Sequence, residues 1–520
     1  MSRIHLTSKP RTYLPALALL ALPACGEADS GAYYESGGDG GAGVGQGGAQ
    51  DFGQFKQILE EGEIPGPETI DDVGFFNEHK IELPKPECGD NVCVHGLFGQ
   101  MGNMINGSPC TTILVGMNTP IDPALLERPP LNLALAIDVS GSMAGESIQY
   151  VREGLDRMLD ALDPQDRITL IAFSDVAQVR VEYTTGDDPN LANAIAQLEA
   201  GGGTNIYDGL RTAFEMVDAH ADPTLQNRVI LLSDGLATAG IESDAKIIDM
   251  AAGYGELGYG LTTIGVGGEF DVELMRTLSE GGSGSFYFLE DPAAVQEVFV
   301  EEVTAFMVPL AEDVTISVDA TGDYVLRGVY GTKSAEGDTQ GAVITIPSLQ
   351  LAHRESADDN TNGRRGGGGA IILELLPAKG AGGESLSVGD ITLTYRDAIT
   401  DLMVEQHVHV DAPIGPQDPG AFFATPSVEK GFVMLNIYMG FQMAATRAAQ
   451  GDLTGAYHVL DGLEMNVAAW LVQTPDFDIE DDPKYIRLLK TNLLNAGAAE
   501  TPPTQPGQEP PPPSEPWPND

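Results

Sequence analysis

The feature that most constrains this fold is a regular alternation of short apolar runs with longer amphipathic segments across residues 131–306. Runs such as Leu133–Ile137 and Val229–Leu232 alternate with segments such as Ser147–Leu162, whose apolar residues recur every three or four positions. A strand that is apolar at consecutive positions is buried on both faces, and helices are the elements that bury it. We therefore predict a doubly wound, mostly parallel α/β sheet covered by helices on both sides.

A different pattern follows this α/β unit. Residues 311–412 contain short strand-like runs separated by Gly- and Asp-rich turns, which is typical of a β-sandwich. Thr111–Met117 is also strand-like and precedes the α/β unit, so we infer that it joins the sandwich and that the α/β unit is inserted into it. Residues 426–496 carry long apolar helical faces and predict a small helical domain.

The predicted domain organisation covers the whole chain. It comprises a signal peptide (1–24), a Gly-rich flexible tether (25–50), an N-terminal segment with two short helices (51–110), a strand joining the sandwich (111–130), the α/β unit (131–306), the sandwich (311–412), the helical domain (426–496) and a disordered Pro-rich tail (501–520).

The first 24 residues have the pattern of an export signal. Basic residues precede the apolar stretch Leu14–Ala24, which is too short to span a bilayer. The stretch ends in Leu22-Pro23-Ala24-Cys25, which resembles the bacterial lipobox, where the cysteine becomes the acylated first residue of the mature protein. We expect a lipoprotein of the cell envelope, anchored only through Cys25, and Gly26 after it favours the outer membrane. A soluble secreted product cut after Ala24 is the alternative.

Charge excludes one class of partner. The chain has 77 acidic and 27 basic residues and a formal net charge of -50. A field of this sign repels nucleic acid and anionic lipid headgroups and attracts cations. We therefore expect no nucleic-acid partner and no membrane contact other than the lipid anchor.

Three cysteines remain beyond Cys25, namely Cys88, Cys93 and Cys110. In an oxidising envelope we expect two of them to pair and one to be left over. Cys88 with Cys93 would close a short loop, whereas either of them with Cys110 would pin the N-terminal segment to the strand that begins near Thr111. The sequence does not choose between these pairings.

Hard oxygen ligands gather at three loops of the α/β unit. Asp138, Ser140 and Ser142 alternate directly after an apolar strand, Thr204 follows three glycines, and Asp234 follows the strand Val229–Leu232. Ligands in a doubly wound sheet bind at the carboxyl ends of the strands, where the strand order reverses. Two carboxylates and three hydroxyls make a site for a hard divalent cation, Mg²⁺ or else Mn²⁺ or Ca²⁺. Because hydroxyls are neutral, the ion stays electron-poor, and a protein partner can supply a carboxylate to an open position.

These residues resemble a known motif. The run Asp138-Val139-Ser140-Gly141-Ser142-Met143, with Thr204 and Asp234, is similar to the metal-ion-dependent adhesion site (MIDAS) of von Willebrand factor type A (VWA) domains, which have a Rossmann-like fold. The resemblance implies that all five side chains contribute to coordination, some through water. Residues 55–65 and 75–79 resemble the N-terminal segment of bacterial VWA lipoproteins. The region after 306 resembles, more loosely, their accessory region and that of inter-alpha-trypsin-inhibitor heavy-chain-like proteins.

Three functions are compatible with these sequence features. The first is an envelope lipoprotein that binds a protein partner through the metal, for adhesion or complex assembly. The second is a structural or assembly factor that binds through its sandwich and helices, with the metal only stabilising the VWA fold. The third, a metal-assisted hydrolase, needs a general base beside the ion. We favour the first function and predict that the chain is not an enzyme.

Overall fold

The computed structural model describes most of the chain between residues 42 and 500. The described residues are 42–45, 49–50, 52–122, 129–234, 236–266, 271–281, 284, 286–289, 309–332, 334–352, 370–378, 386–415 and 420–500. The predicted signal peptide, Cys25, most of the tether, the last predicted helix of the α/β unit and the Pro-rich tail lie outside them. No helix within the described ranges is both long enough and apolar enough to cross a bilayer.

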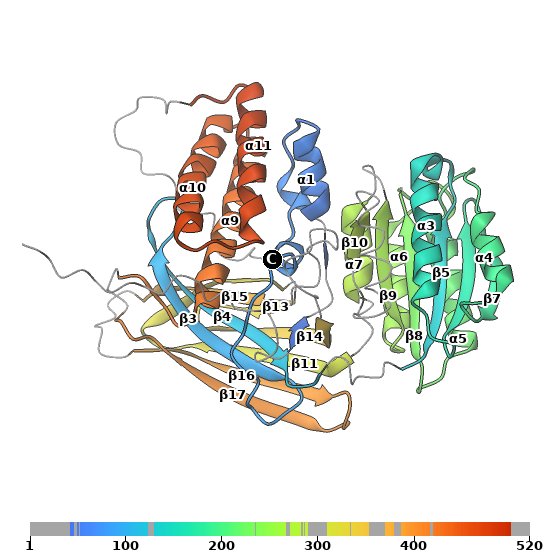
Figure 1. Ribbon diagram of the computed structural model, residues 1–520, viewed down its shortest axis with the longest axis horizontal. Helices are drawn as coiled ribbons and strands as arrows, with labels where there is room; N and C mark the ends of the chain where they lie inside the picture. Colours follow the sequence, from blue (N-terminus) through green and yellow to red (C-terminus); the bar gives the residue numbers. More distant parts are fainter. Residues whose placement is uncertain are drawn as a thin grey trace, which may run out of the picture. The chain divides into compact units, whose positions relative to one another are not determined.

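The predicted α/β fold is confirmed. Its strands form a sheet in the order β2-β10-β9-β8-β5-β6-β7, in which only β7 is antiparallel to its neighbour. Figure 1 shows the sheet with helices packed along it. The strands are β2 (Ala49–Gln50), β5 (Leu131–Asp138), β6 (Arg167–Phe173), β7 (Ala177–Thr184), β8 (Gln226–Ser233), β9 (Gly260–Val266) and β10 (Phe286–Leu289). The helices are α3 (Glu146–Asp160), α4 (Pro189–Ala196), α5 (Ile206–Ala219), α6 (Asp244–Gly255) and α7 (Val272–Gly281).

The central strand β5 explains why the sheet needs helices on both faces. All eight of its residues are buried. Leu133 and Leu135 lie in one apolar core with residues of α3 and α4, whereas Ala134 and Ala136 lie in a second core with residues of α5 and α6. Successive side chains of a strand point to opposite faces, so the apolar run supplies both cores. Each fully buried Leu or Ile contributes about 1.5–3 kcal/mol to the free energy of unfolding.

The strands before and after the α/β unit form a second sheet, in the order β12-β15-β4-β1-β14-β11-β16-β17. Three further strands lie off this path: β13 pairs with β14, β3 pairs with β4, and β18 pairs with β3. Strand β4 comes before the α/β unit and β15 comes after it, yet Leu114 of β4 pairs with Ile372 of β15. The α/β unit is therefore inserted into this sheet. The strands are β1 (Ala42–Gly45), β3 (Cys93–Gly102), β4 (Pro109–Thr119), β11 (Pro309–Ala320), β12 (Tyr324–Tyr330), β13 (Ala335–Gly337), β14 (Gly341–Ala352), β15 (Ala370–Pro377), β16 (Ser387–Asp397), β17 (Met403–Asp411) and β18 (Phe422–Phe423).

Two predicted boundaries need correction. The predicted flexible tether (25–50) includes Ala42–Gly45, which forms β1 between β4 and β14, and Ala49–Gln50, which forms β2 beside β10. The predicted N-terminal segment (51–110) includes Cys93–Gly102, which forms strand β3 and pairs along its whole length with β4. The strand contains three glycines. Glycine lowers strand propensity and interrupts the alternation of apolar and polar side chains by which a strand is predicted. The glycines allow close packing, because a Cβ at Gly96 would lie 2.7 Å from Ile391 Cδ1, and one at Gly99 would lie 2.7 Å from Val428 Cγ1.

The N-terminal segment packs against the C-terminal helices rather than serving as a spacer. Phe52 and Phe55 of α1 lie with their ring centroids 6.0 and 5.0 Å from that of Phe441. The same apolar core includes Phe75 and Phe76 of α2 together with residues of α10 and α11. The helices are α1 (Phe52–Glu60), α2 (Asp72–Asn77), α9 (Pro426–Ala449), α10 (Leu453–Gln473) and α11 (Asp482–Asn495).

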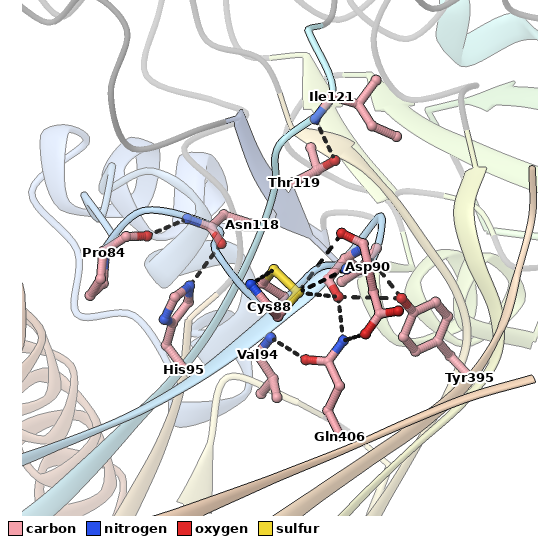
Figure 2. Close-up of a disulfide and its surroundings, with 12 residues drawn as sticks. Pro84, Cys88, Asp90, Val94, His95, Asn118, Thr119, Ile121, Tyr395 and Gln406 are labelled. Carbon is pink, nitrogen blue, oxygen red and sulfur yellow. Dashed lines mark hydrogen bonds between the residues drawn. A yellow bond between two sulfur atoms is a disulfide. The ribbon is translucent and has the colours of Figure 1, made fainter.

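Of the possible cysteine pairings, the structure contains the one that closes the short loop. Cys88 and Cys93 form a disulfide with their Cα atoms 5.6 Å apart. Figure 2 shows this disulfide beside Tyr395 and Gln406, whose side chain donates a hydrogen bond to the Val92 carbonyl at 2.6 Å. Cys110 is a buried free thiol, and its burial raises the pKa of the thiol well above the ordinary value.

Candidate metal centre

The five predicted ligands lie at the switch point of the α/β sheet. The chain passes from β5 to β6 on one side, and from β8 to β9 on the other, so the strand order reverses between β5 and β8. Asp138 is the last residue of β5, and Asp234 follows the last residue of β8. Because β5 and β8 are adjacent and parallel, both carboxylates come to the same edge of the sheet.

A chain of hydrogen bonds joins the predicted ligands of the first and third loops. The Ser140 and Ser142 hydroxyls lie 3.0 Å apart, and the Ser142 hydroxyl donates to Asp234 Oδ1 at 2.8 Å. The Ser140 backbone N–H donates to Asp138 Oδ1 at 2.8 Å, which fixes this carboxylate in the loop. Four of the five predicted side chains are thus brought together.

The glycine-rich loop holds the fifth residue, Thr204, beside the other two loops. The Gly141 N–H donates to the Gly202 carbonyl at 3.0 Å, which ties this loop to the first. On the other side, the Thr204 carbonyl accepts from the Thr238 N–H at 2.9 Å, and the Thr204 N–H donates to Thr238 Oγ1 at 3.0 Å. Thr204 itself is buried, with 4% of its surface exposed.

The two carboxylates are buried, which disfavours their charged forms. Asp138 is 0% exposed and Asp234 is 8% exposed. Burial, with a smaller contribution from the charge of Asp234, raises the pKa of Asp138 to about 6 even though hydrogen bonds from Ser233 and Ser140 lower it. Burial also raises the pKa of Asp234. Within the described residues neither carboxylate has a basic partner, so a cation between them would relieve an unfavourable burial of two like charges.

The donor chemistry fits a hard divalent cation. The candidate ligands are all oxygens, and the two carboxylates supply the negative charge that the ion needs. In the part of the chain that the structure describes, no three His, Cys, Asp or Glu side chains gather in a metal-binding geometry.

Two further residues shape the site but are not among the predicted ligands. The Ser233 hydroxyl donates to Asp138 Oδ2 at 2.6 Å and so links β8 to β5. Asp175, in the turn after β6, accepts a hydrogen bond from the Gly203 N–H at 3.1 Å. Asp175 follows the carboxyl end of β6, which lies at the same sheet edge. Because ligands bind at the carboxyl ends of strands in such sheets, Asp175 could have been identified from the sequence.

Gly202 offers a test of how the glycine loop is built. Its φ is +95°, and a Cβ there would lie 2.9 Å from Asp175 Oδ2. We expect Gly202→Ala to lower the free energy of unfolding by about 1–2 kcal/mol and to weaken Mg²⁺ binding, because an L-residue is strained at this φ and displaces the loop. Urea unfolding and Mg²⁺ calorimetry measure the two effects.

Gly253 is a matched control for Gly202. It lies inside α6, and a Cβ there would meet nothing within 4 Å. Gly253→Ala should therefore stabilise the protein by about 0.5–1 kcal/mol, since alanine favours a helix over glycine. Equal stability of the two alanine variants would contradict the account of the loop.

Comparison with known proteins finds a family model that matches the α/β unit. This model, described as the von Willebrand factor type A domain, matches residues 132–301. The uncharacterized protein YfbK of Escherichia coli strain K12 is 27% identical over 196 residues, which is 37% of this chain and 34% of YfbK. Inter-alpha-trypsin inhibitor heavy chain H4 of Homo sapiens is 31% identical over 193 residues, which is 35% of this chain and 21% of that protein. The chain therefore spans about a third or less of the length of these two relatives.

Solved structures are similar at low sequence identity. A von Willebrand factor type A protein from Catenulispora acidiphila covers 78% of this chain and 96% of its own, with a TM-score of 0.46 and 15% identity. Proximal thread matrix protein 1 from the mussel byssus, in a structure described as having a zinc-occupied MIDAS motif, covers 37% of this chain and 47% of its own, with a TM-score of 0.29 and 18% identity.

Proposed function

Because the chain carries a von Willebrand factor type A domain, matched over residues 132–301, we propose that it binds a protein partner through a divalent cation. Asp138, Ser140, Ser142, Thr204 and Asp234 would hold the ion, either directly or through water. The cation is Mg²⁺, or else Mn²⁺ or Ca²⁺, and it supplies an electrophilic position for a carboxylate of the partner. The observation that carries this proposal is the pair of buried carboxylates, which have no basic partner among the described residues and are bordered by hydroxyls at the switch point.

The neutral hydroxyls favour binding of a partner over catalysis. Three of the five ligands are uncharged, so their donation leaves much of the ion's charge available to an incoming carboxylate. Ser142 is exposed, whereas Asp138 is fully buried. A partner would therefore reach the ion from the exposed side, where Ser142 lies. The buried carboxylate of Asp138 would hold the ion on the side facing the core.

The rest of the proposal concerns where the protein works. We place it in the cell envelope, attached to a membrane through a lipid on Cys25, with the outer membrane favoured. This placement rests on the export signal and the lipobox-like Leu22–Cys25. Globomycin, which blocks lipoprotein signal peptidase, should cause the longer precursor to accumulate, whereas Cys25→Ala should release the protein from the membrane fraction.

The function is tested by capture of partners from envelope extract. The tagged full chain is compared in Mg²⁺, in EDTA, and in EDTA followed by excess Mg²⁺. We expect capture that is lost in EDTA, restored by Mg²⁺ and absent for Asp234→Ala. Asp160→Ala is the control, since Asp160 is an exposed carboxylate at the C-terminal end of α3, about 20 Å along the helix from Glu146. Capture that persists in EDTA and with Asp234→Ala would contradict the proposal and favour binding through the strands or helices.

A further inference from the structure

The loops around the metal centre expose two aliphatic side chains. Val176, in the turn after β6, is 56% exposed, and Leu236, two residues beyond Asp234, is 57% exposed. Large aliphatic side chains that are more than half exposed contribute nothing to the core of this domain. Their position beside the candidate ligands makes them available to a bound partner.

The glycine loop brings the turns that bear these two side chains close to each other. A Cβ at Gly203 would lie 2.9 Å from Asp175 Oδ1 and 3.2 Å from Ala239 Cβ. The Asp175–Val176 turn and the Leu236–Ala239 segment therefore meet at Gly203, which has no side chain to hold them apart. Gly201 and Gly202 are themselves exposed, so the surface beside the two turns is backbone without side chains. We call this exposed backbone the glycine floor.

The charge of the same loops has one sign. Residues 138–147, 174–177, 199–206 and 234–244 contain no Lys or Arg. Besides the two candidate metal-binding carboxylates, they carry Glu146, Asp175, Glu199, Glu242 and Asp244, which are all exposed. A partner that presents only acidic groups would be attracted by the ion but repelled by this rim.

We propose that the metal centre selects a partner segment in which the metal-binding Asp or Glu is flanked by an aliphatic residue and by Lys or Arg. The proposal rests on the proposed function, and it adds the chemistry of the partner. The aliphatic side chain lies over the glycine floor between Val176 and Leu236. The basic side chains face the carboxylates of the rim, chiefly Asp175, Glu146 and Glu242. These contacts give the selectivity that the ion alone cannot give, because any carboxylate can bind a cation.

Four fluorescent nonapeptides with a central Asp test the proposal. They carry Leu or Ser next to the Asp, and Lys or Glu three positions away, in all combinations. Binding to the full chain is measured by fluorescence anisotropy, in Mg²⁺ and in EDTA. We expect the Leu/Lys peptide to bind about tenfold more tightly than either singly changed peptide, and about 100-fold more tightly than the Ser/Glu peptide. EDTA should abolish all four interactions.

Variants separate the two kinds of contact. Leu236→Ser should remove the preference for Leu and keep the preference for Lys, whereas combined Glu146→Gln and Glu242→Gln should do the reverse. Asp160→Ala, far from the rim, should change neither. Mg²⁺-dependent binding of all four peptides with equal affinity, or with a preference for Glu, would overturn this inference and leave the proposed function standing. No Mg²⁺-dependent binding by any peptide at millimolar concentration would contradict both.

Discussion

With Asp138 replaced by alanine, the full chain is expected to bind Mg²⁺ more than about 100-fold more weakly, because even residues that only orient a metal ligand contribute 10–100-fold. The carboxylate is fully buried, and hydrogen bonds from the Ser140 N–H and the Ser233 hydroxyl hold it in a fixed orientation. Calorimetric titration with Mg²⁺ measures the affinity. Thermal unfolding provides a second measurement, since an ion at 100 times its Kd stabilises the native wild type by about 2.7 kcal/mol.

The same variant should be less affected when Mg²⁺ is absent. Removing one of two buried like charges relieves their repulsion, although the bonds from Ser140 and Ser233 are lost. We therefore expect Asp138→Ala to lack the Mg²⁺-dependent rise in melting temperature, and Asp160→Ala to show the full rise. If Asp138→Ala retained that rise, the ion would have to bind elsewhere.

The second large effect concerns the junction between the N-terminal segment and the C-terminal helices. His79 and Asp482 are both 0% exposed, and His79 Nε2 lies 2.9 Å from Asp482 Oδ2. The other ring nitrogen, Nδ1, lies 2.7 Å from the Phe75 carbonyl. We expect His79→Ala or Asp482→Ala to lower the free energy of unfolding by about 3–5 kcal/mol, because each change leaves a buried polar partner unsatisfied. Denaturant unfolding of the full chain, followed by tryptophan fluorescence, measures the loss, since Trp470 lies in the apolar core that these helices share.

An exposed ion pair between the same two regions is the control. Lys484 Nζ lies 2.7 Å from Glu60 Oε1, with side chains that are 54% and 50% exposed. Glu60→Ala should change stability by less than about 1 kcal/mol, because solvent screens exposed pairs. The double variant His79→Leu with Asp482→Leu should lose less than either single alanine variant, since neither side chain of the pair is then left buried without the other. Additive losses would contradict the coupling.

The sequence predicted the α/β unit well because its signal is local. Runs such as that of β5 are buried at every position, and helices such as α3 present apolar residues at helical spacing. The insertion of this unit was also predictable, since the strand at Thr111–Met117 needed a partner and the later strands provided one. All five predicted ligands lie at the switch point. The α/β fold predicts a ligand site at the carboxyl ends of the strands, and the motif residues follow those same strand ends.

Other features depend on contacts between residues far apart in the sequence. Strand β3 was missed because its glycines accommodate side chains such as Ile391 and Val428, which come about 300 residues later. The role of Ser233 depends on the register between β5 and β8, which the sequence does not give. The pairing of Cys88 with Cys93 was one of several open options until the N-terminal segment was placed. No local pattern encodes the burial of His79 against Asp482.

Anomalous diffraction from crystals of the full chain grown with Mn²⁺ locates the ion without reference to any partner. We expect a strong manganese peak among Ser140, Ser142, Thr204 and the carboxylates of Asp138 and Asp234, and we expect this peak to disappear in Asp138→Ala crystals. A manganese peak elsewhere with none at the carboxyl ends of β5 and β8, or a peak that persists in Asp138→Ala, would contradict the proposed metal centre.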